Sequence, residues 1–433
     1  MMTLLVGLLL VIAPAHAVDR VFQFGHEVYL DRTDSPGVVN GDDYFKTNGV
    51  YKARWALVYL IRDSDGALLE SEYTDDDGLV HFQIPHNVAV RFRLFAHHDV
   101  NGSGRHVVVK EDATDLVHLF ADGPVFYDWS LPGLPTTTTN VVFDGSVTGN
   151  EWINVAAIAS WTVRRRASAF PTGVYYKFAL DDPGGGLAGK WDFSEETVLI
   201  DPGVSIDGWR YKTVIAHELG HALQYWANGA HQPITDVSLN DASCPSAGTT
   251  HRVVSKEYQS GAINEGMAQW VAAVAFNNTT EADCKHVIHD NITWHVNSGL
   301  SPYPYSCEGY VVGGPDQDAG VEDSFGVSGA DYMHEPHGTP PNDVACTDTT
   351  PNVNTAVELD WERFLWDLVT KEGVTFGKIV EAYDEAEPQD WYMGAPRDDF
   401  ANALEYVMTN GTQWLDPYDN PWHNQAPRNG VDQ

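Results

Sequence analysis

Hydrophobic and polar positions alternate with a period of two through much of the first 130 residues. The pattern is clearest in residues 53–62, 79–84 and 88–97. Such alternation indicates strands with one buried face, and the Asp-Gly pairs at 65–66 and 77–78 are typical of tight turns in antiparallel hairpins. We therefore predict an antiparallel β-sandwich over residues 18–130.

From about residue 146 the spacing of apolar residues changes to that of helices. Residues 152–163 place their apolar side chains on one side, and residues 211–228 form an apolar run that ends at Gly229, a common helix terminator. Residues 263–276 are apolar nearly all round, which predicts a buried helix. Later helices are predicted at residues 356–371, 376–385 and 400–409, and a short strand at residues 198–201.

These patterns predict an α+β protein in three parts. The β-sandwich is followed by residues 131–145, where Pro and Thr without periodicity predict an exposed linker. Residues 146–433 form the third part, which mixes helices and strands and becomes helical towards the C-terminus.

The first residues are typical of a secretory signal. Residues 4–12 are an apolar run, and Ala15-His16-Ala17 matches the A-x-A cleavage pattern, although no Lys or Arg precedes the run. The run is shorter than the roughly 20 residues of a membrane span. We predict a signal peptide at residues 1–17, export of the remaining chain, and no membrane insertion.

The chain contains four cysteines, at positions 244, 284, 307 and 346. An even number in an exported chain favours disulfides over free thiols. Three pairings can be drawn, and we prefer the two that join neighbours in sequence, Cys244 with Cys284 and Cys307 with Cys346. No two cysteines have C-x-x-C spacing, which argues against a cysteine-based zinc site.

The charge balance excludes some partners. The chain has 25 basic and 61 acidic residues, a net charge of −36, which argues against nucleic acid or an anionic membrane surface as a partner.

Residues 75–77 are three consecutive Asp, interpreted as a solvated turn, with a structural Ca²⁺ as the alternative. Residues 99–104 begin like a calcium loop, but Lys110 stands where the twelfth position needs an acid. His97, His98 and other scattered histidines lack ligand spacing and are interpreted as surface residues.

One motif carries recognisable metal chemistry. His217-Glu218-Leu219-Gly220-His221 is an H-E-x-x-H sequence inside an apolar helical run. Residues four apart share a helical face, so both imidazoles can bind one ion, while Glu218 at the edge of that face can reach water on the metal. The alternative, an amphipathic helix with two exposed histidines, fits the apolar surroundings poorly, because burying such groups without a ligand is costly.

A third ligand must come from elsewhere. The longer pattern H-E-x-x-H-x-x-G-x-x-H fails, because Gln224 and Ala227 stand where it needs Gly and His. Glu265 is the only acidic residue across a buried helical stretch, and such a carboxylate needs a cation or strong donors. The alternatives are a Glu265 on a solvent face or hydrogen-bonded in the core. Glu257 and Glu281 are weaker ligand candidates, since their surroundings are polar.

The two segments together resemble a known family. H-E-L-G-H followed by N-E-G-x-A, with His217, Glu218, His221, Asn264 and Glu265, resembles the gluzincin metallopeptidases, the thermolysin-like clan in the broad sense. The resemblance implies a zinc peptidase whose cleft lies between an α/β part and a helical part. It also implies that residues 198–201 align the substrate.

Two details qualify this resemblance. Gln269 stands where thermolysin carries an Asp that orients a zinc-bound His, so this support must differ. Residues 53–85, with their Asp-Gly turns, resemble the carboxypeptidase-regulatory or transthyretin-like sandwich, which implies an accessory module.

The ligand set implies a mechanism. Two imidazoles and a carboxylate leave a fourth zinc position for water, whose pKa falls to about 7, and Glu218 serves as general base. We expect a secreted zinc endopeptidase acting on a protein or peptide substrate. The alternatives are a non-catalytic secreted surface or matrix-binding protein that retains a zincin scaffold, and hydrolysis of another acyl bond. The donor for the oxyanion is not identified, and its loop candidates are Tyr310, Tyr332, His334 and His337.

Overall fold

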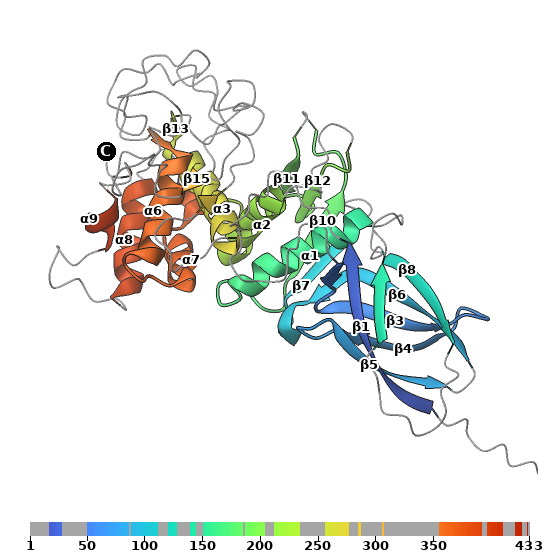
Figure 1. Ribbon diagram of the computed structural model, residues 1–433. Helices are drawn as coiled ribbons and strands as arrows, with labels where there is room; N and C mark the ends of the chain where they lie inside the picture. The colour runs from blue at the N-terminus through green and yellow to red at the C-terminus, as the bar shows by residue number, and fades with distance from the viewer. Residues whose placement is uncertain are drawn as a thin grey trace, which may run out of the picture.

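The protein is an α+β protein (Figure 1). The computed structural model describes residues 17–27, 50–85, 88–110, 120–127, 139–143, 150–184, 187–203, 212–233, 256–276, 285–286, 305–306, 355–391, 396–409, 421–426 and 431. Residues 1–16 of the predicted signal peptide, all four cysteines and the four loop candidates for the oxyanion donor lie outside these ranges.

A four-stranded sheet is built around β1 (Ala17–Glu27). The strands β2 (Val50–Lys52) and β5 (Leu79–Pro85) run antiparallel to β1, and β9 (Thr139–Phe143) runs parallel to it. The strand β9 corrects our prediction of an exposed linker over residues 131–145, because Val141 and Phe143 are buried. Five residues next to a Pro- and Thr-rich run are too few to show a period.

A second sheet has eight strands in the order β11-β12-β10-β7-β6-β3-β4, with β8 also paired to β6. The pairs β7–β10 and β10–β12 are parallel, and the other pairs are antiparallel. This sheet therefore continues across the boundary that we predict between residues 130 and 146. Its strands are β3 (Ala56–Arg62), β4 (Leu68–Tyr73), β6 (Ala89–Asp99), β7 (His106–Lys110), β8 (Phe120–Tyr127), β10 (Tyr175–Leu180), β11 (Gly189–Asp192) and β12 (Thr197–Ile200).

The two sheets face each other through aromatic rings. Phe92 of β6 lies 4.6 Å from Phe22, 5.1 Å from Phe24 and 5.9 Å from Phe82, measured between ring centroids. The alternation is confirmed in residues 79–84 and 89–94, where every second side chain is buried: Val80, Phe82, Ile84, Val90, Phe92 and Leu94. It ends after Leu94, because residues 95–98 are all buried.

Only one of the two Asp-Gly turns closes a hairpin. The turn at 65–66 joins the antiparallel strands β3 and β4, as predicted. The turn at 77–78 instead connects β4 to β5, which belong to different sheets, so the second predicted hairpin is wrong. A Cβ on Gly78 would lie 2.7 Å from the Phe24 carbonyl oxygen, so the chain passes close to β1 here. The turn residues mark a reversal, but they do not select the partner strand.

The six predicted helices are present. They are α1 (Asn150–Arg165), α2 (Lys212–Ala227), α3 (Gln259–Phe276), α6 (Glu358–Thr370), α7 (Phe376–Glu385) and α8 (Pro396–Met408), and a short α9 (Pro421–Gln425) follows. Both α3 and α8 begin four residues before their predicted starts.

Short elements complete the fold. Two antiparallel strand pairs are β13 (Lys256–Tyr258) with β16 (Thr355–Val357) and β14 (Lys285–His286) with β15 (Tyr305–Ser306). Two 3₁₀ turns are η1 (Val100–Gly102) and η4 (Pro388–Asp390).

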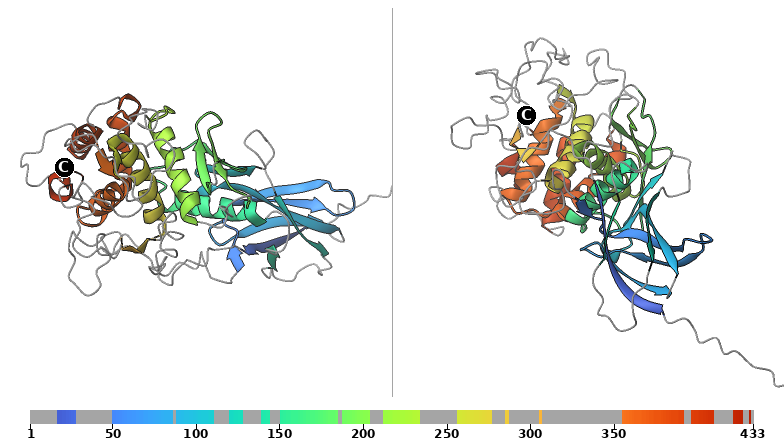
Figure 2. Two further views of the ribbon diagram at one scale, coloured as in Figure 1. Left: turned by 90° about the horizontal axis from the view of Figure 1, so that it is seen from above. Right: turned by 45° about the vertical axis from the view of Figure 1, so that its right-hand side comes forward.

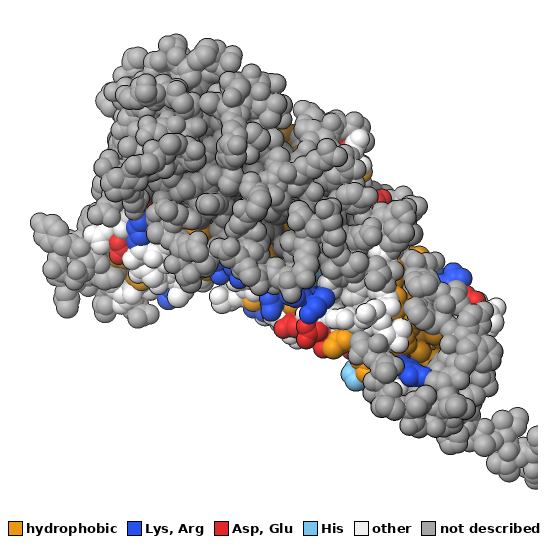
Figure 3. Space-filling model, viewed as in Figure 1, with side chains coloured by type: hydrophobic (Ala, Val, Ile, Leu, Met, Phe, Trp, Pro, Cys, Tyr) orange, Lys and Arg blue, Asp and Glu red, His pale blue; other side chains and the backbone are white. Residues whose placement is uncertain are grey.

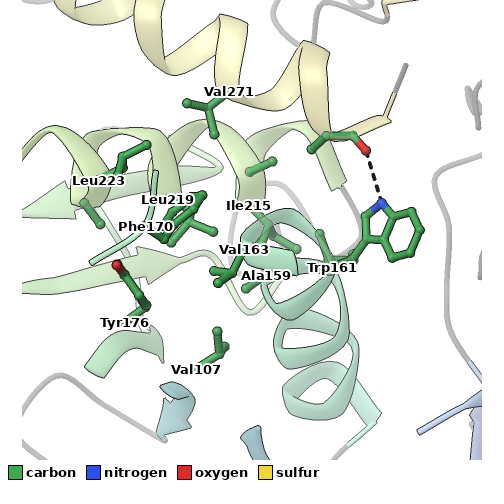
Figure 4. Packing of buried hydrophobic residues seen from close by; sticks show 14 of the residues in the cluster. Val107, Ala159, Trp161, Val163, Phe170, Tyr176, Ile215, Leu219, Leu223 and Val271 are labelled. Atoms are coloured by element: carbon green, nitrogen blue, oxygen red, sulfur yellow. Dashed lines mark hydrogen bonds between the residues drawn. The ribbon is translucent and has the colours of Figure 1, made fainter. Parts of the chain in front are cut away.

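The sheets lie at one end of the molecule and the helices α6, α7 and α8 at the other (Figures 1 and 2). The helix α1 packs on the large sheet, α2 packs between α1 and α3, and α6 covers the far side of α3. Figure 4 shows Ile215, Leu219 and Leu223 of α2 among buried side chains of the α1 region. The Trp161 indole N–H donates to the Ala275 carbonyl at 3.1 Å and so joins α1 to α3 (Figure 4). The two helices with the metal-ligand motif are therefore held on both sides by packed helices.

The charged surface is locally paired. Figure 3 shows basic and acidic side chains next to one another on the described part of one face. The Asp75–Asp77 run behaves as a solvated turn, since Asp75 accepts from the Leu79 backbone, Asp76 from the Trp55 indole and Asp77 from Lys52. Among the residues described, no helix has the length and apolar character that crossing a membrane requires.

Candidate metal centre

The candidate site forms where α2 and α3 approach closely. A Cβ on Gly220 would lie 2.7 Å from the Ala268 Cα and 3.1 Å from its carbonyl oxygen. These contacts are closer than the 3.5–4.0 Å of ordinary carbon contacts, so only glycine permits this crossing. The approach places His221 of α2 opposite Glu265 of α3.

Three ligand atoms converge at this crossing. The Nε2 atoms of His217 and His221 are 3.2 Å apart, and the Glu265 Oε2 lies 3.2 Å from the first and 3.1 Å from the second. The side chains are 13%, 14% and 16% exposed, so the triangle is nearly buried but reachable. Within the described part of the chain, it is the one group of three His, Cys, Asp or Glu with metal-ligand spacing.

The triangle fits the coordination sphere of a zinc ion. Ligands about 2.0–2.1 Å from a tetrahedral ion are about 3.3 Å from each other, close to all three edges found here. Hydrogen bonding alone explains these short distances less well than a bound ion does, because two imidazole Nε2 atoms and one carboxylate oxygen all converge on one position. Two imidazoles with one carboxylate are also a common ligand set of catalytic zinc.

The electrostatics of the site favour a cation. Burial lowers the pKa of His221, but the charge and hydrogen bond of Glu265, with contributions from Glu218 and Gln224, outweigh burial and raise that pKa to about 9. The ring therefore lies in a strongly negative environment. A metal ion would gain from the same negative charge as the proton does.

His221 is oriented by a hydrogen-bonded series across three helices. Its Nδ1 donates to the Gln224 Oε1 at 3.0 Å, and the Gln224 Nε2 donates to the Asn264 carbonyl at 2.5 Å. The Asn264 Oδ1 in turn accepts from the Tyr383 hydroxyl of α7 at 2.6 Å. Burial, with the charge of Glu265, holds the pKa of Tyr383 well above its usual value, so the phenol remains a donor. Support of this kind fixes the orientation of a metal-binding imidazole.

Sequence reasoning missed this series. It used Gln224 only to reject a longer motif, although the i, i+3 spacing from His221 was the available signal. For His217, the Nδ1 is buried and makes no hydrogen bond within the described residues. Gln269 is buried on α3, and within the described residues it makes no hydrogen bond to the His217 Nδ1.

Glu218 is held between α2 and β11. The residue is 8% exposed, and burial raises the pKa of its carboxyl, while the charges of His217 and His221 and a hydrogen bond from the Trp191 backbone N–H lower it. A Cβ on Gly189 would lie 2.9 Å from the Glu218 Cγ, so this glycine makes room for the side chain. Glu218 is thus next to both imidazoles without being one of the three converging ligands.

The strand beside Glu218 is β11, and this corrects the expectation for residues 198–201. Those residues correspond to β12, which pairs with β10 on one side and β11 on the other, so neither of its edges is open to a substrate. Among the described strands, β11 forms one edge of the large sheet, and β4 lies at the opposite end. Because the Trp191 N–H reaches Glu218, the outer edge of β11 faces the candidate site.

A hollow of about 450 Å³ lies along the same strand. It is lined by Lys190, Trp191, Asp192, Phe193, Ser194 and Gln232. The Trp191 and Phe193 rings pack edge to face at 6.0 Å, which gives the hollow an aromatic wall beside the polar Lys190 and Gln232.

The weaker ligand candidates are not placed at the site. Glu257 belongs to β13, but its side chain is not described, and Glu281 lies outside the described residues. No protein-family model matches the chain, and no curated protein matches it in sequence.

Proposed function

We propose that the chain is a secreted zinc-dependent endopeptidase of the gluzincin type. The N-terminal strands β3, β4, β6, β7 and β8 belong to the same sheet as β11, so in this proposal they support the site instead of forming a separate accessory module. One observation supports this proposal most strongly. Two imidazole nitrogens from α2 and one carboxylate oxygen from α3 lie within 3.1–3.2 Å of one another, and a fourth group, the Glu218 carboxyl, lies beside them. Export rests on the predicted signal peptide at residues 1–17.

Each residue has a distinct role in the proposed reaction. His217, His221 and Glu265 would hold Zn²⁺, which when bound activates water and polarises a peptide carbonyl. Glu218 takes a proton from the attacking water and delivers it to the leaving amine. Burial raises the pKa of Glu218, which makes the carboxylate a better proton acceptor than an exposed one. Gln224 keeps the His221 ring in the orientation that points its Nε2 towards the His217 Nε2 and the Glu265 Oε2, where it would hold the ion.

The edge strand gives a mode of substrate binding. The Trp191 N–H on the outer edge of β11 is bonded to Glu218, and an extended peptide can add to the remaining main-chain groups of that edge, as in other cases of strand addition. Main-chain recognition of this kind needs no free chain end, which favours an endopeptidase over an exopeptidase. The hollow beside Trp191 and Phe193 would then receive a substrate side chain.

The test uses Glu218→Gln in the full chain. We expect it to retain one zinc per chain and to lose cleavage of an unfolded protein by roughly 10²–10⁴-fold, the usual contribution of a general base. Glu195→Gln makes the same charge change at an exposed position after β11 and should cleave like wild type. Cleavage by Glu218→Gln at the wild-type rate would refute the assigned role.

A second variant tests the ligand set. Glu265→Ala should lower zinc content below one per chain and remove chelator-sensitive cleavage. Full zinc occupancy without cleavage of any peptide by wild type would instead favour a non-catalytic surface-binding protein on the same scaffold.

A further inference from the structure

A second group of ligand-type side chains lies on the large sheet, away from α2 and α3. It consists of His97 at the end of β6, His106 of β7 and Tyr73 of β4. The register pairs His97 with Val108 and Asp99 with His106, so His97 and His106 lie on one face of the sheet, opposite the face of Ala96 and Val107. The register pairs Asp99 with His106 and His106 with Tyr175, which brings these residues into one row across the sheet.

Sequence reasoning took His97 and His98 for surface residues, and this is wrong. The two residues are only 7% and 1% exposed. The row could not be found from spacing along the chain, because its members come from neighbouring strands rather than from one helix.

Two contacts meet at one nitrogen. The His97 Nε2 lies 3.3 Å from the His106 Nδ1 and 3.3 Å from the Tyr73 hydroxyl. Both distances are long for hydrogen bonds, which centre near 2.7–3.0 Å. Each contact matches the separation of about 3.3 Å between two ligands of a tetrahedral ion, and the His97 Nε2 is common to both.

The surroundings hold the rings and favour positive charge. Tyr175 stacks on His106 with ring centroids 4.6 Å apart and planes 15° apart, which fixes that imidazole. Asp99 is the register partner of His106, so its carboxylate lies on the same face of the sheet, where its charge would attract a cation.

We propose that His97, His106 and Tyr73 form a second metal site, which takes a late first-row divalent ion and binds Cu²⁺ most tightly. Imidazole ligands suit copper, zinc and nickel, and affinity for a given site rises to a maximum at Cu²⁺ in the divalent series. The site links β4, β6 and β7. It shares no residue with the proposed zinc site and does not depend on peptidase activity.

The test is a copper titration of the metal-free full chain in excess glycine, a weak competitor that suppresses binding by single exposed imidazoles. Wild type should bind two Cu²⁺ per chain, one at each site, and show a tyrosinate-to-copper charge-transfer band. His106→Phe keeps an aromatic ring to stack on Tyr175 and removes the ligand nitrogen, so it should bind one Cu²⁺ and lose the band. Tyr73→Phe should also lose the band.

The control is His81→Phe, on β5, whose side chain is 67% exposed and which should bind two Cu²⁺ with the band intact. Circular dichroism and thermal unfolding verify that each variant is folded, and His97→Gln repeats the test if His106→Phe fails to fold. Absence of the band in wild type, an unchanged Cu²⁺ count in folded His106→Phe, or equal losses in His106→Phe and His81→Phe would each overturn the proposal. One Cu²⁺ in wild type with the band present would count against the proposed zinc site alone.

Discussion

Replacing Gly220 by Ala tests how the helix crossing builds the metal centre. The added Cβ would lie 2.7 Å from the Ala268 Cα and 3.1 Å from the Ala268 Cβ. Relief to ordinary carbon contacts of 3.5–4.0 Å requires α2 and α3 to separate by about 1 Å. The neighbouring Ala268 atoms belong to the backbone or are attached directly to it, so a change of side-chain rotamer cannot relieve the clash.

That separation acts directly on the ligand triangle. The His221 Nε2 to Glu265 Oε2 distance of 3.1 Å would open to about 4 Å, whereas a tetrahedral zinc needs about 3.3 Å. We expect zinc affinity to fall about 10–100-fold, by analogy with the loss of a supporting side chain. Overpacking costs about 1–3 kcal/mol and the Gly-to-Ala change in a helix returns about 0.5–1 kcal/mol, which leaves a net loss of stability between about 0 and 2.5 kcal/mol.

The assay is competition for zinc with a chromophoric chelator, together with thermal unfolding of the zinc-free chain. Gly377→Ala in α7 is the matched control, since its nearest neighbours would be the Ser168 carbonyl at 3.8 Å and hydroxyl at 3.9 Å. The control should keep wild-type zinc affinity and lose no stability. Wild-type zinc affinity in Gly220→Ala would refute the argument that this close approach sets the ligand distances.

Three further changes have defined outcomes. Gln224→Ala removes the acceptor of the His221 Nδ1 and should lower zinc affinity about 10–100-fold, measured by the same competition. Gly189→Ala places a Cβ 2.9 Å from the Glu218 Cγ and should lower kcat for peptide cleavage while zinc content stays unchanged. Burial and two neighbouring carboxylates raise the pKa of Asp399 above 3.8, so its ionisation opposes folding at neutral pH. Asp399→Asn should therefore raise Tm at pH 7, and the gain should vanish as the pH falls below 3.8, where both states are protonated.

Local patterns in the sequence were sufficient for the helices and for the three candidate ligands that they bring together. The two histidines lie four apart on one helix, so their common face follows from helical geometry alone. Glu265 could be selected because a single carboxylate in an apolar helix needs a positive partner. In both cases the information is carried within one element and its immediate neighbours.

Contacts between distant segments could not be predicted in the same way. Alternation showed that residues 79–84 form a strand, but not that β5 pairs with β1 rather than with β4. The edge position of β11 depends on the order of all eight strands, so residues 198–201 were chosen wrongly for the substrate. The role of Gln224 required the position of Asn264 on another helix, and the row of His97 and His106 required strand register.

The most direct test is the position of zinc in a crystal of the zinc-loaded chain, located by anomalous scattering. The account predicts a peak about 2.0–2.2 Å from each of His217 Nε2, His221 Nε2 and Glu265 Oε2. Full zinc occupancy with no peak between these three atoms, or a peak bound by the two histidines while Glu265 points elsewhere, would contradict it.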